Sequence, residues 1–289
     1  NEDVVIPLER MGEYTEGIER INIELSLRNK LELVDALEHF FARGALPLGK
    51  TDDAGEIPSA ELLEDRVAQA QALLREVRVL WQGWLDGLDV VQPDSGESFF
   101  AQLQDWRLRA SWKTQILKPL QGLFAGGAFT PILDECRRIH AQVLKGRVWV
   151  ALHMHAGDGN VHTNIPVNSD NYAMLQRANA AVARIMQVAR DLDGVISGEH
   201  GIGITKLEFL TDDETAAFRQ YKRTVDPDGR FNKGKLLPGA DLRNAYTPSF
   251  GLMGHESLIM QQSDIKGISD AIKDCLRCGK CKPVCSTHV

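Results

Sequence analysis

The chain has 289 residues, of which 43% are hydrophobic and 25% are charged, the composition of a globular protein that can form a core without disulfide or metal support. It carries 33 lysines and arginines against 40 aspartates and glutamates, and this net charge of −7 speaks against nucleic acid as a partner. No apolar stretch approaches the roughly 18 residues that a transmembrane helix needs, so no transmembrane segment is expected. The chain starts with NEDVVIPLER, without a Met or a signal-peptide pattern, which predicts a mature or excised segment of a longer protein.

The first 128 residues are predicted to be mostly helical after one short strand. Residues 3–7 (DVVIP) predict this strand, and glycines and prolines between residues 44 and 58 predict a loop between helices. Ser59 can cap a long helix after the loop, and another helix is expected over residues 96–124. Apolar residues in steps of three and four along the long helix indicate packing against other helices rather than a cofactor site. This stripe consists of Leu63, Val67, Ala70, Leu74, Val77, Trp81, Trp84 and Leu88.

From residue 129 onward, the pattern alternates between helix and strand. It predicts a helix over residues 131–144, a strand over 147–155, a second strand over 161–167 and a short strand over 194–197. Between the last two strands, a helix is expected after the capping residues 168–170. Helices mixed with a predicted hairpin favour the α+β class over a doubly wound sheet.

Histidines flank the predicted hairpin turn. Asp158-Gly159 between two apolar strands is typical of a two-residue type I′ turn, in which both central residues have positive φ. This register places His155 opposite His162, with Cβ atoms about 4.5–5.5 Å apart, close enough to share a metal. The alternative is that the polar residues of the hairpin simply occupy the solvent face of a two-sided sheet. For His153, a role in the site and a position on the solvent face both stay open. The polar residues of this face are His153, His155, His162 and Asn164.

A glycine-rich segment at residues 197–203 (SGEHGIG) supplies further polar groups. Glu199 offers the carboxylate that a pair of metal-binding histidines needs as a third ligand, and His200 follows it directly. The glycines permit a tight turn and close backbone approach, but their order does not match a dinucleotide-binding fingerprint. Lys206 after the turn either holds an anion or faces solvent.

Four cysteines near the C-terminus have the spacing C-x2-C-x2-C-x3-C: Cys275, Cys278, Cys281 and Cys285. This spacing predicts a 4Fe-4S cluster of the bacterial ferredoxin type, with a structural zinc site or a fortuitous run of cysteines as the alternatives. Ser286 stands where the ferredoxin motif has proline, and no second cysteine motif is present, so the module is expected to be truncated and its cluster incomplete. Free thiols without a signal sequence predict a cytoplasmic protein, and peripheral association with the inner face of the membrane through a partner stays open.

Together, HAGDGNVH at residues 155–162 and SGEHGIG at residues 197–203 closely resemble the C-terminal cap domain of FAD-linked oxidases of the vanillyl-alcohol oxidase type. The nearest members are D-2-hydroxyacid dehydrogenases, including D-lactate dehydrogenase and the flavin subunit of glycolate oxidase. EDVVIPLERM at residues 2–11 and DPDGRFNKGKLLP at residues 226–238 also resemble segments of this family, in the same order. The cysteine motif resembles oxidases that are fused to a ferredoxin module.

The resemblance implies a ferredoxin-like α+β cap domain that is interrupted by helices. Residues 1–24 and 129–245 would form the cap, residues 25–128 an all-helical insertion, and residues 246–289 a linker followed by the truncated ferredoxin motif.

The resemblance also implies roles for individual residues. His155, His162 and Glu199 would bind a divalent zinc or manganese ion, Asn164 would contact the substrate, and His200 would be the general base. If Lys206 binds an anion, it would be one of the substrate-binding residues.

The expected activity is oxidation of a D-2-hydroxy acid of the lactate, glycolate or 2-hydroxyglutarate class. FAD would be held mainly by a domain of the same parent protein that this chain lacks, and electrons would pass through the 4Fe-4S cluster to a downstream acceptor. The chain alone is therefore expected to retain no FAD and to be inactive. The alternatives are a non-catalytic iron–sulfur electron-transfer or interaction module, and a hydrolase whose metal is bound by two histidines and a glutamate.

Overall fold

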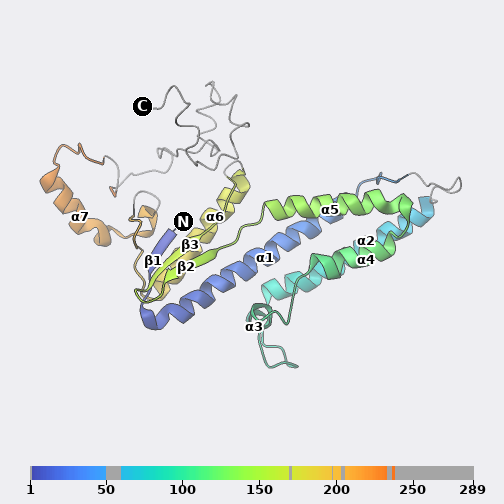
Figure 1. The fold of residues 1–289 in the computed structure, drawn as a ribbon, viewed down its shortest axis with the longest axis horizontal. Coiled ribbons are helices and arrows are strands. Elements are labelled where there is room, and N and C mark those ends of the chain that lie inside the picture. Colours follow the sequence, from blue (N-terminus) through green and yellow to red (C-terminus); the bar gives the residue numbers. More distant parts are fainter. Residues whose placement is uncertain are drawn as a thin grey trace, which may run out of the picture. The chain divides into compact units, whose positions relative to one another are not determined.

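The computed structural model divides the chain into two compact units, which are described separately (Figure 1). The first unit comprises Asn1–Pro7, Met154–His162 and Val167–Val289, and the second comprises Leu8–His153 and Thr163–Pro166. The residues that the structure describes are 2–49, 60–168, 171–196, 198–202, 206–232 and 236–237. None of the helices in these ranges is long and apolar enough to cross a membrane.

The described residues include a small antiparallel sheet with the strand order β1-β3-β2. These strands are β1 (Glu2–Val5), β2 (Ala151–His155) and β3 (Asn160–Asn164). Helix α6 (Tyr172–Asp191) packs against β1, and its buried face includes Leu175, Ile185 and Met186. Because β3 is the central strand of the sheet, its residues from Asn160 to Thr163 are all buried.

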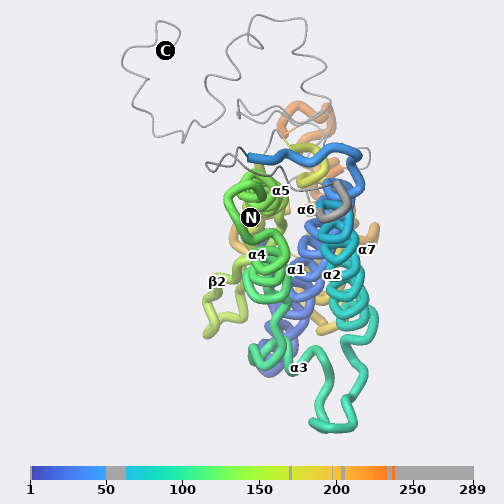
Figure 2. The backbone as a smooth tube through the Cα atoms, turned by 90° about the vertical axis from the view of Figure 1, so that its right-hand side faces the viewer, coloured from blue at the N-terminus to red at the C-terminus, as the bar shows by residue number. Residues whose placement is uncertain are grey.

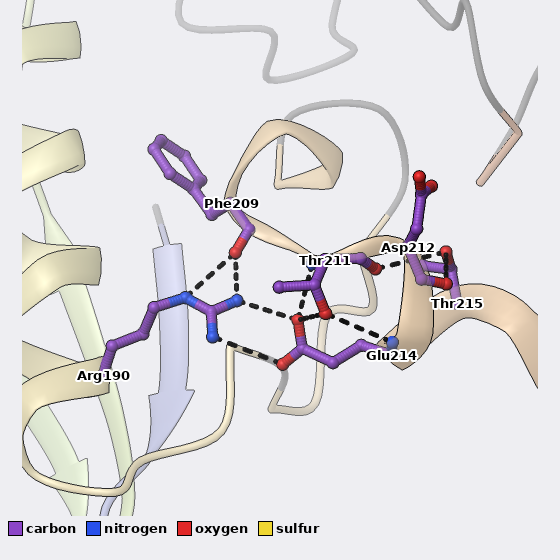
Figure 3. Close-up of polar contacts among 6 residues, drawn as sticks. All are labelled: Arg190, Phe209, Thr211, Asp212, Glu214 and Thr215. Atoms are coloured by element: carbon purple, nitrogen blue, oxygen red, sulfur yellow. Dashed lines mark hydrogen bonds and ion pairs between the residues drawn. The ribbon is translucent and has the colours of Figure 1, made fainter.

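After α6, the chain continues through the 3-10 helix η4 (Leu207–Phe209) into α7 (Asp212–Val225). The guanidinium of Arg190 on α6 donates a 3.0 Å hydrogen bond to the carbonyl oxygen of Phe209 and forms a 3.0 Å ion pair with Glu214 (Figure 3). Glu214 also forms a capping box with Thr211, in which each side chain accepts a hydrogen bond from the other residue's backbone N–H. Arg190 thereby connects α6 with the N-terminus of α7.

These contacts make the stability of α7 dependent on pH. The hydrogen bond from Arg190, together with that from the Thr211 backbone, lowers the pKa of Glu214 to about 2. A lowered carboxyl pKa stabilises the fold above the unfolded-state pKa, and this contribution disappears as the pH falls through the folded-state value. We expect Glu214→Gln to cost about 1 kcal/mol near neutrality, since the ion pair is partly exposed, and almost nothing near pH 2. Urea unfolding followed by circular dichroism measures this difference. Glu208→Gln, which removes an exposed carboxylate, should show no such pH-dependent loss, and an equal loss would contradict this role of Glu214.

The second unit is mostly helical. The long helices α1 (Met11–Phe41), α2 (Ala60–Asp86) and α5 (Thr130–Lys145) pack with α1 beside both α2 and α5 (Figure 2). Shorter elements complete the unit: η1 (Leu8–Arg10), α3 (Phe99–Gln104), the π-helix η2 (Trp112–Leu117), α4 (Lys118–Leu123) and η3 (Gly127–Phe129).

The apolar stripe on α2 faces the core of this unit, as its spacing predicts. Ala70, Leu74 and Trp81 are fully buried, and Leu63 and Val67 are partly buried against the same core. The prediction of helix–helix packing is confirmed.

Several predicted boundaries differ from the structure, among them the end of the strand expected over residues 161–167, which stops at Asn164. The helix expected over residues 96–124 is interrupted between α3 and η2, where Trp106 has a φ of 69° that a helix does not accept. The strand expected from residue 147 begins at Ala151, because the Asn22 side chain binds both the N–H and the carbonyl of Val150. Residues 194–197 contribute only a bridge between Val5 and Val195.

The predicted division into cap, insertion and ferredoxin motif stays a prediction. Its boundary after residue 24 lies within the continuous helix α1, in which Ile23 and Leu27 are buried on successive turns, whereas the first compact unit breaks after Pro7. Helices together with a small sheet agree with the α+β class. A ferredoxin-like fold has four strands, and the described residues form three, so that part of the prediction is not confirmed.

Candidate metal centre

Three side chains of the first unit form a cluster suited to a metal ion. His155 ends β2, His162 lies on β3, and Glu199 lies in the segment that follows the Val5–Val195 bridge. The Nε2 atoms of His155 and His162 lie 3.5 and 3.7 Å from the two carboxylate oxygens of Glu199. One ligand atom from each residue lies within 4.8 Å of the others, a spacing that suits a metal with bonds of about 2.0–2.2 Å. Two imidazoles and one carboxylate leave coordination positions open for a substrate.

The two histidines come together without the predicted turn. The strands end at His155 and resume at Asn160, and Asp158 N–H donates to His155 O, so the loop has four residues rather than two. Gly159 has a φ of 71°, but Asp158 does not have the positive φ that a type I′ turn requires, so this prediction is wrong. A loop longer by two residues preserves the alternation of faces, and the rings of His155 and His162 still lie 5.5 Å apart.

His200 lies beside the cluster and belongs to a second set of possible ligands. Its ring is 5.2 Å from that of His162 and nearly perpendicular to it. Asp3, His162 and His200 also bring ligand atoms within 4.8 Å of one another. His162 is common to both sets and is buried, whereas His155, Glu199 and His200 are exposed. An exposed imidazole next to a metal site can exchange protons with a bound substrate.

Part of the chain is similar to a known family. Residues 130–236 match the family model described as FAD linked oxidases, C-terminal domain. These residues are a C-terminal domain of the FAD-linked oxidases. The domain contains His155, His162, Glu199 and His200, so all the residues of the first ligand set lie within it.

Several curated proteins are similar to the chain. Glycolate oxidase subunit GlcD of Escherichia coli (strain K12) is 38% identical over 93 residues, which are 31% of this chain and 19% of that protein. D-lactate dehydrogenase [cytochrome], mitochondrial, of Arabidopsis thaliana is 33% identical over 88 residues, 29% of this chain and 16% of that protein. D-2-hydroxyglutarate dehydrogenase of Xanthomonas citri pv. viticola is 28% identical over 222 residues, 71% of this chain and 44% of that protein. The chain therefore spans less than half the length of each of these relatives.

Lys206 is buried, so the alternative prediction that its side chain faces solvent is wrong. Its ammonium group is buried, forms an ion pair with Asp3 Oδ1 and donates a 2.8 Å hydrogen bond to the Asp3 carbonyl oxygen. The anion that Lys206 holds in the structure is therefore the carboxylate of Asp3, and substrate binding by Lys206 has no support from these contacts.

Asp3 is the residue that sequence reasoning missed. Its other carboxylate oxygen, Oδ2, accepts a 2.9 Å hydrogen bond from the His200 N–H. Burial alone would raise the pKa of Asp3, but the hydrogen bonds from Lys206 and His200 hold it below its ordinary value. The only sequence signal for this position was a charged residue at the start of an apolar strand.

The roles of the other predicted site residues stay predictions. Asn164 ends β3 two residues beyond His162, hence on the same face of the strand, and its contact with a substrate stays a prediction. The predicted cluster ligands Cys275, Cys278, Cys281 and Cys285 lie outside the described residues.

Proposed function

We propose that this oxidase domain supplies the metal-binding and substrate-binding half of an FAD-dependent dehydrogenase. The substrate would be a D-2-hydroxy acid of the lactate, glycolate or 2-hydroxyglutarate class, and the product the 2-oxo acid. The observation that carries the proposal is the cluster of His155, His162 and Glu199 with His200 beside it. The names of the relatives, which include glycolate oxidase, D-lactate dehydrogenase and D-2-hydroxyglutarate dehydrogenase, support this substrate class.

The donor set fits a divalent zinc or manganese ion, since both accept imidazole and carboxylate ligands. Such an ion, when bound, would supply a Lewis acid for the hydroxyl and carboxylate oxygens of the substrate. His155, His162 and Glu199 would hold it, and the single negative charge of Glu199 would leave the site positive toward an anionic acid. His200 would accept the hydroxyl proton on an imidazole nitrogen, because imidazole can take up a proton near neutral pH. Asn164 would hydrogen-bond the substrate from the same face of the hairpin.

Oxidation of the alcohol also requires a two-electron acceptor. FAD, bound mainly by another domain of the same parent protein, would supply that acceptor for the hydride of the α-carbon. The chain alone would then retain no FAD and would not turn over. Ligation of a 4Fe-4S cluster by the four cysteines, and electron transfer through it to a downstream acceptor, remain part of the proposal on the strength of their spacing.

Anaerobic reduction of the full-length parent protein tests the proposal. We expect D-lactate, glycolate or D-2-hydroxyglutarate to bleach the flavin absorbance, whereas the L-enantiomers of the chiral acids do not. His200→Gln should slow the bleaching by about 10²–10⁴-fold, the usual contribution of a general base. His39→Gln, an exposed histidine of α1, is the control and should bleach at the parental rate. Bleaching at the parental rate in His200→Gln, or none with any of these acids, would contradict the proposal.

A further inference from the structure

The pair formed by Asp3 and Lys206 joins residues 203 positions apart in the sequence. Both side chains are almost completely buried, with 0% of the Asp3 side chain and 3% of the Lys206 side chain exposed. Burying two charges costs desolvation energy that their attraction only partly offsets, so a buried ion pair is weak evidence of a role in stability alone. The other contacts of Asp3 indicate what the pair does.

The hydrogen bond between the His200 N–H and Asp3 Oδ2 fixes one particular peptide group. This N–H belongs to the peptide bond that links Glu199 to His200. Anchoring it to β1 therefore restricts the proposed metal ligand Glu199 and the proposed base His200 at the same time. Lys206 binds the other carboxylate oxygen of Asp3 and its carbonyl oxygen, which fixes the orientation of the carboxylate.

Gly198 shows how closely this segment approaches Asp3. A Cβ atom at Gly198 would lie 2.3 Å from Asp3 Oδ2 and 2.7 Å from Asn160 Oδ1, so no other residue fits without displacing one of them. On the other side of the segment, Val5 and Val195 exchange backbone hydrogen bonds of 2.8 and 3.0 Å. Strand β1 thus holds the segment at both Val195 and His200.

We infer that Asp3 is a positioning residue, which, with Lys206 as its fixed counter-ion, holds the Glu199–His200 peptide against β1 so that Glu199 faces His155 and His162. The inference rests on the proposed function, since it assigns a purpose to the geometry of the same site. Its distinctive requirement is a hydrogen-bond acceptor at position 3, and not a charge.

Two double variants separate the acceptor from the charge. Asp3→Asn with Lys206→Met removes both charges and keeps an amide oxygen for the His200 N–H. Asp3→Leu with Lys206→Met removes both charges and the acceptor. Neutralising both members of a buried pair avoids the unpaired charge that a single substitution would leave. A third variant, Lys222→Met with Asp226→Asn, removes another largely buried ion pair of the same unit and is the matched control.

Mn²⁺ binding to the full chain, followed by electron paramagnetic resonance, is the first readout. We expect the Asn-containing variant and the control to bind Mn²⁺ within a few-fold of the unmodified chain, and the Leu-containing variant about 10–100-fold more weakly, the usual effect of losing an outer-shell contact. Exchange of the His200 amide hydrogen, followed by NMR, is the second readout. It should be slow in the unmodified chain and the Asn variant, and fast in the Leu variant.

Equal Mn²⁺ affinities in the two double variants, whether both are retained or both are lost, would overturn the inference, because the acceptor would then not be the deciding feature. A protected His200 amide in a chain that binds no Mn²⁺ would instead preserve the anchoring and contradict the proposed metal site. The two failures are therefore distinguishable.

Discussion

Replacing Gly159 by alanine is expected to destabilise the first unit by about 2–4 kcal/mol and to weaken metal binding strongly. Gly159 has a φ of 71°, and a Cβ atom there would lie 2.2 Å from the carbonyl oxygen of Ile6. Its own carbonyl accepts a 2.8 Å hydrogen bond from the Ile6 N–H. An alanine would therefore separate the hairpin loop from the end of β1, and with it disturb the strand that carries His162.

Gly157 in the same loop provides the matched control. No atom lies within 4 Å of a Cβ at this position, and its φ is not in the left-handed region. Gly157→Ala should leave both the urea midpoint and the Mn²⁺ affinity essentially unchanged. If the two alanine variants behave alike, the contact between the loop and Ile6 does not support the site.

Replacing His162 by glutamine is expected to lower the affinity for Mn²⁺ by about 100-fold or more. His162 is the buried histidine of the cluster and belongs to both possible ligand sets, so its loss removes a ligand whichever set binds the ion. Glutamine keeps a polar side chain of similar size, so that the loss of binding is not simply a packing defect.

His153→Gln on the neighbouring strand β2 is the control, because His153 is exposed and belongs to neither ligand set. We expect it to bind Mn²⁺ within a few-fold of the unmodified chain. Equal losses in both variants would mean that the ion is not held as the cluster indicates.

The sequence predicts best those features that depend on periodicity. The stripe on α2 was identified correctly because helical spacing alone brings residues such as Leu74 and Trp81 to one face. Alternation along the strands likewise placed His155 and His162 on the same face, and this held although the loop between them is longer than predicted.

The features that were missed depend on contacts between distant residues. The positive φ of Gly159 occurs where its backbone lies close to that of Ile6. The late start of β2 results from the hydrogen bonds between Asn22 and Val150. The pairing of Asp3 with Lys206 joins residues 203 positions apart in the sequence, and no local pattern indicates it. In each case a tertiary contact overrides or supplements the local signal.

The most direct test of the account is a comparison of Mn²⁺ binding by His155→Ala and His200→Ala, since each histidine belongs to only one of the two ligand sets. If His155, His162 and Glu199 bind the metal while His200 acts as the base, His200→Ala retains about one Mn²⁺ per chain and His155→Ala loses it. The reverse result, with the ion lost in His200→Ala and retained in His155→Ala, would place the metal between Asp3, His162 and His200 and contradict the roles proposed for the site.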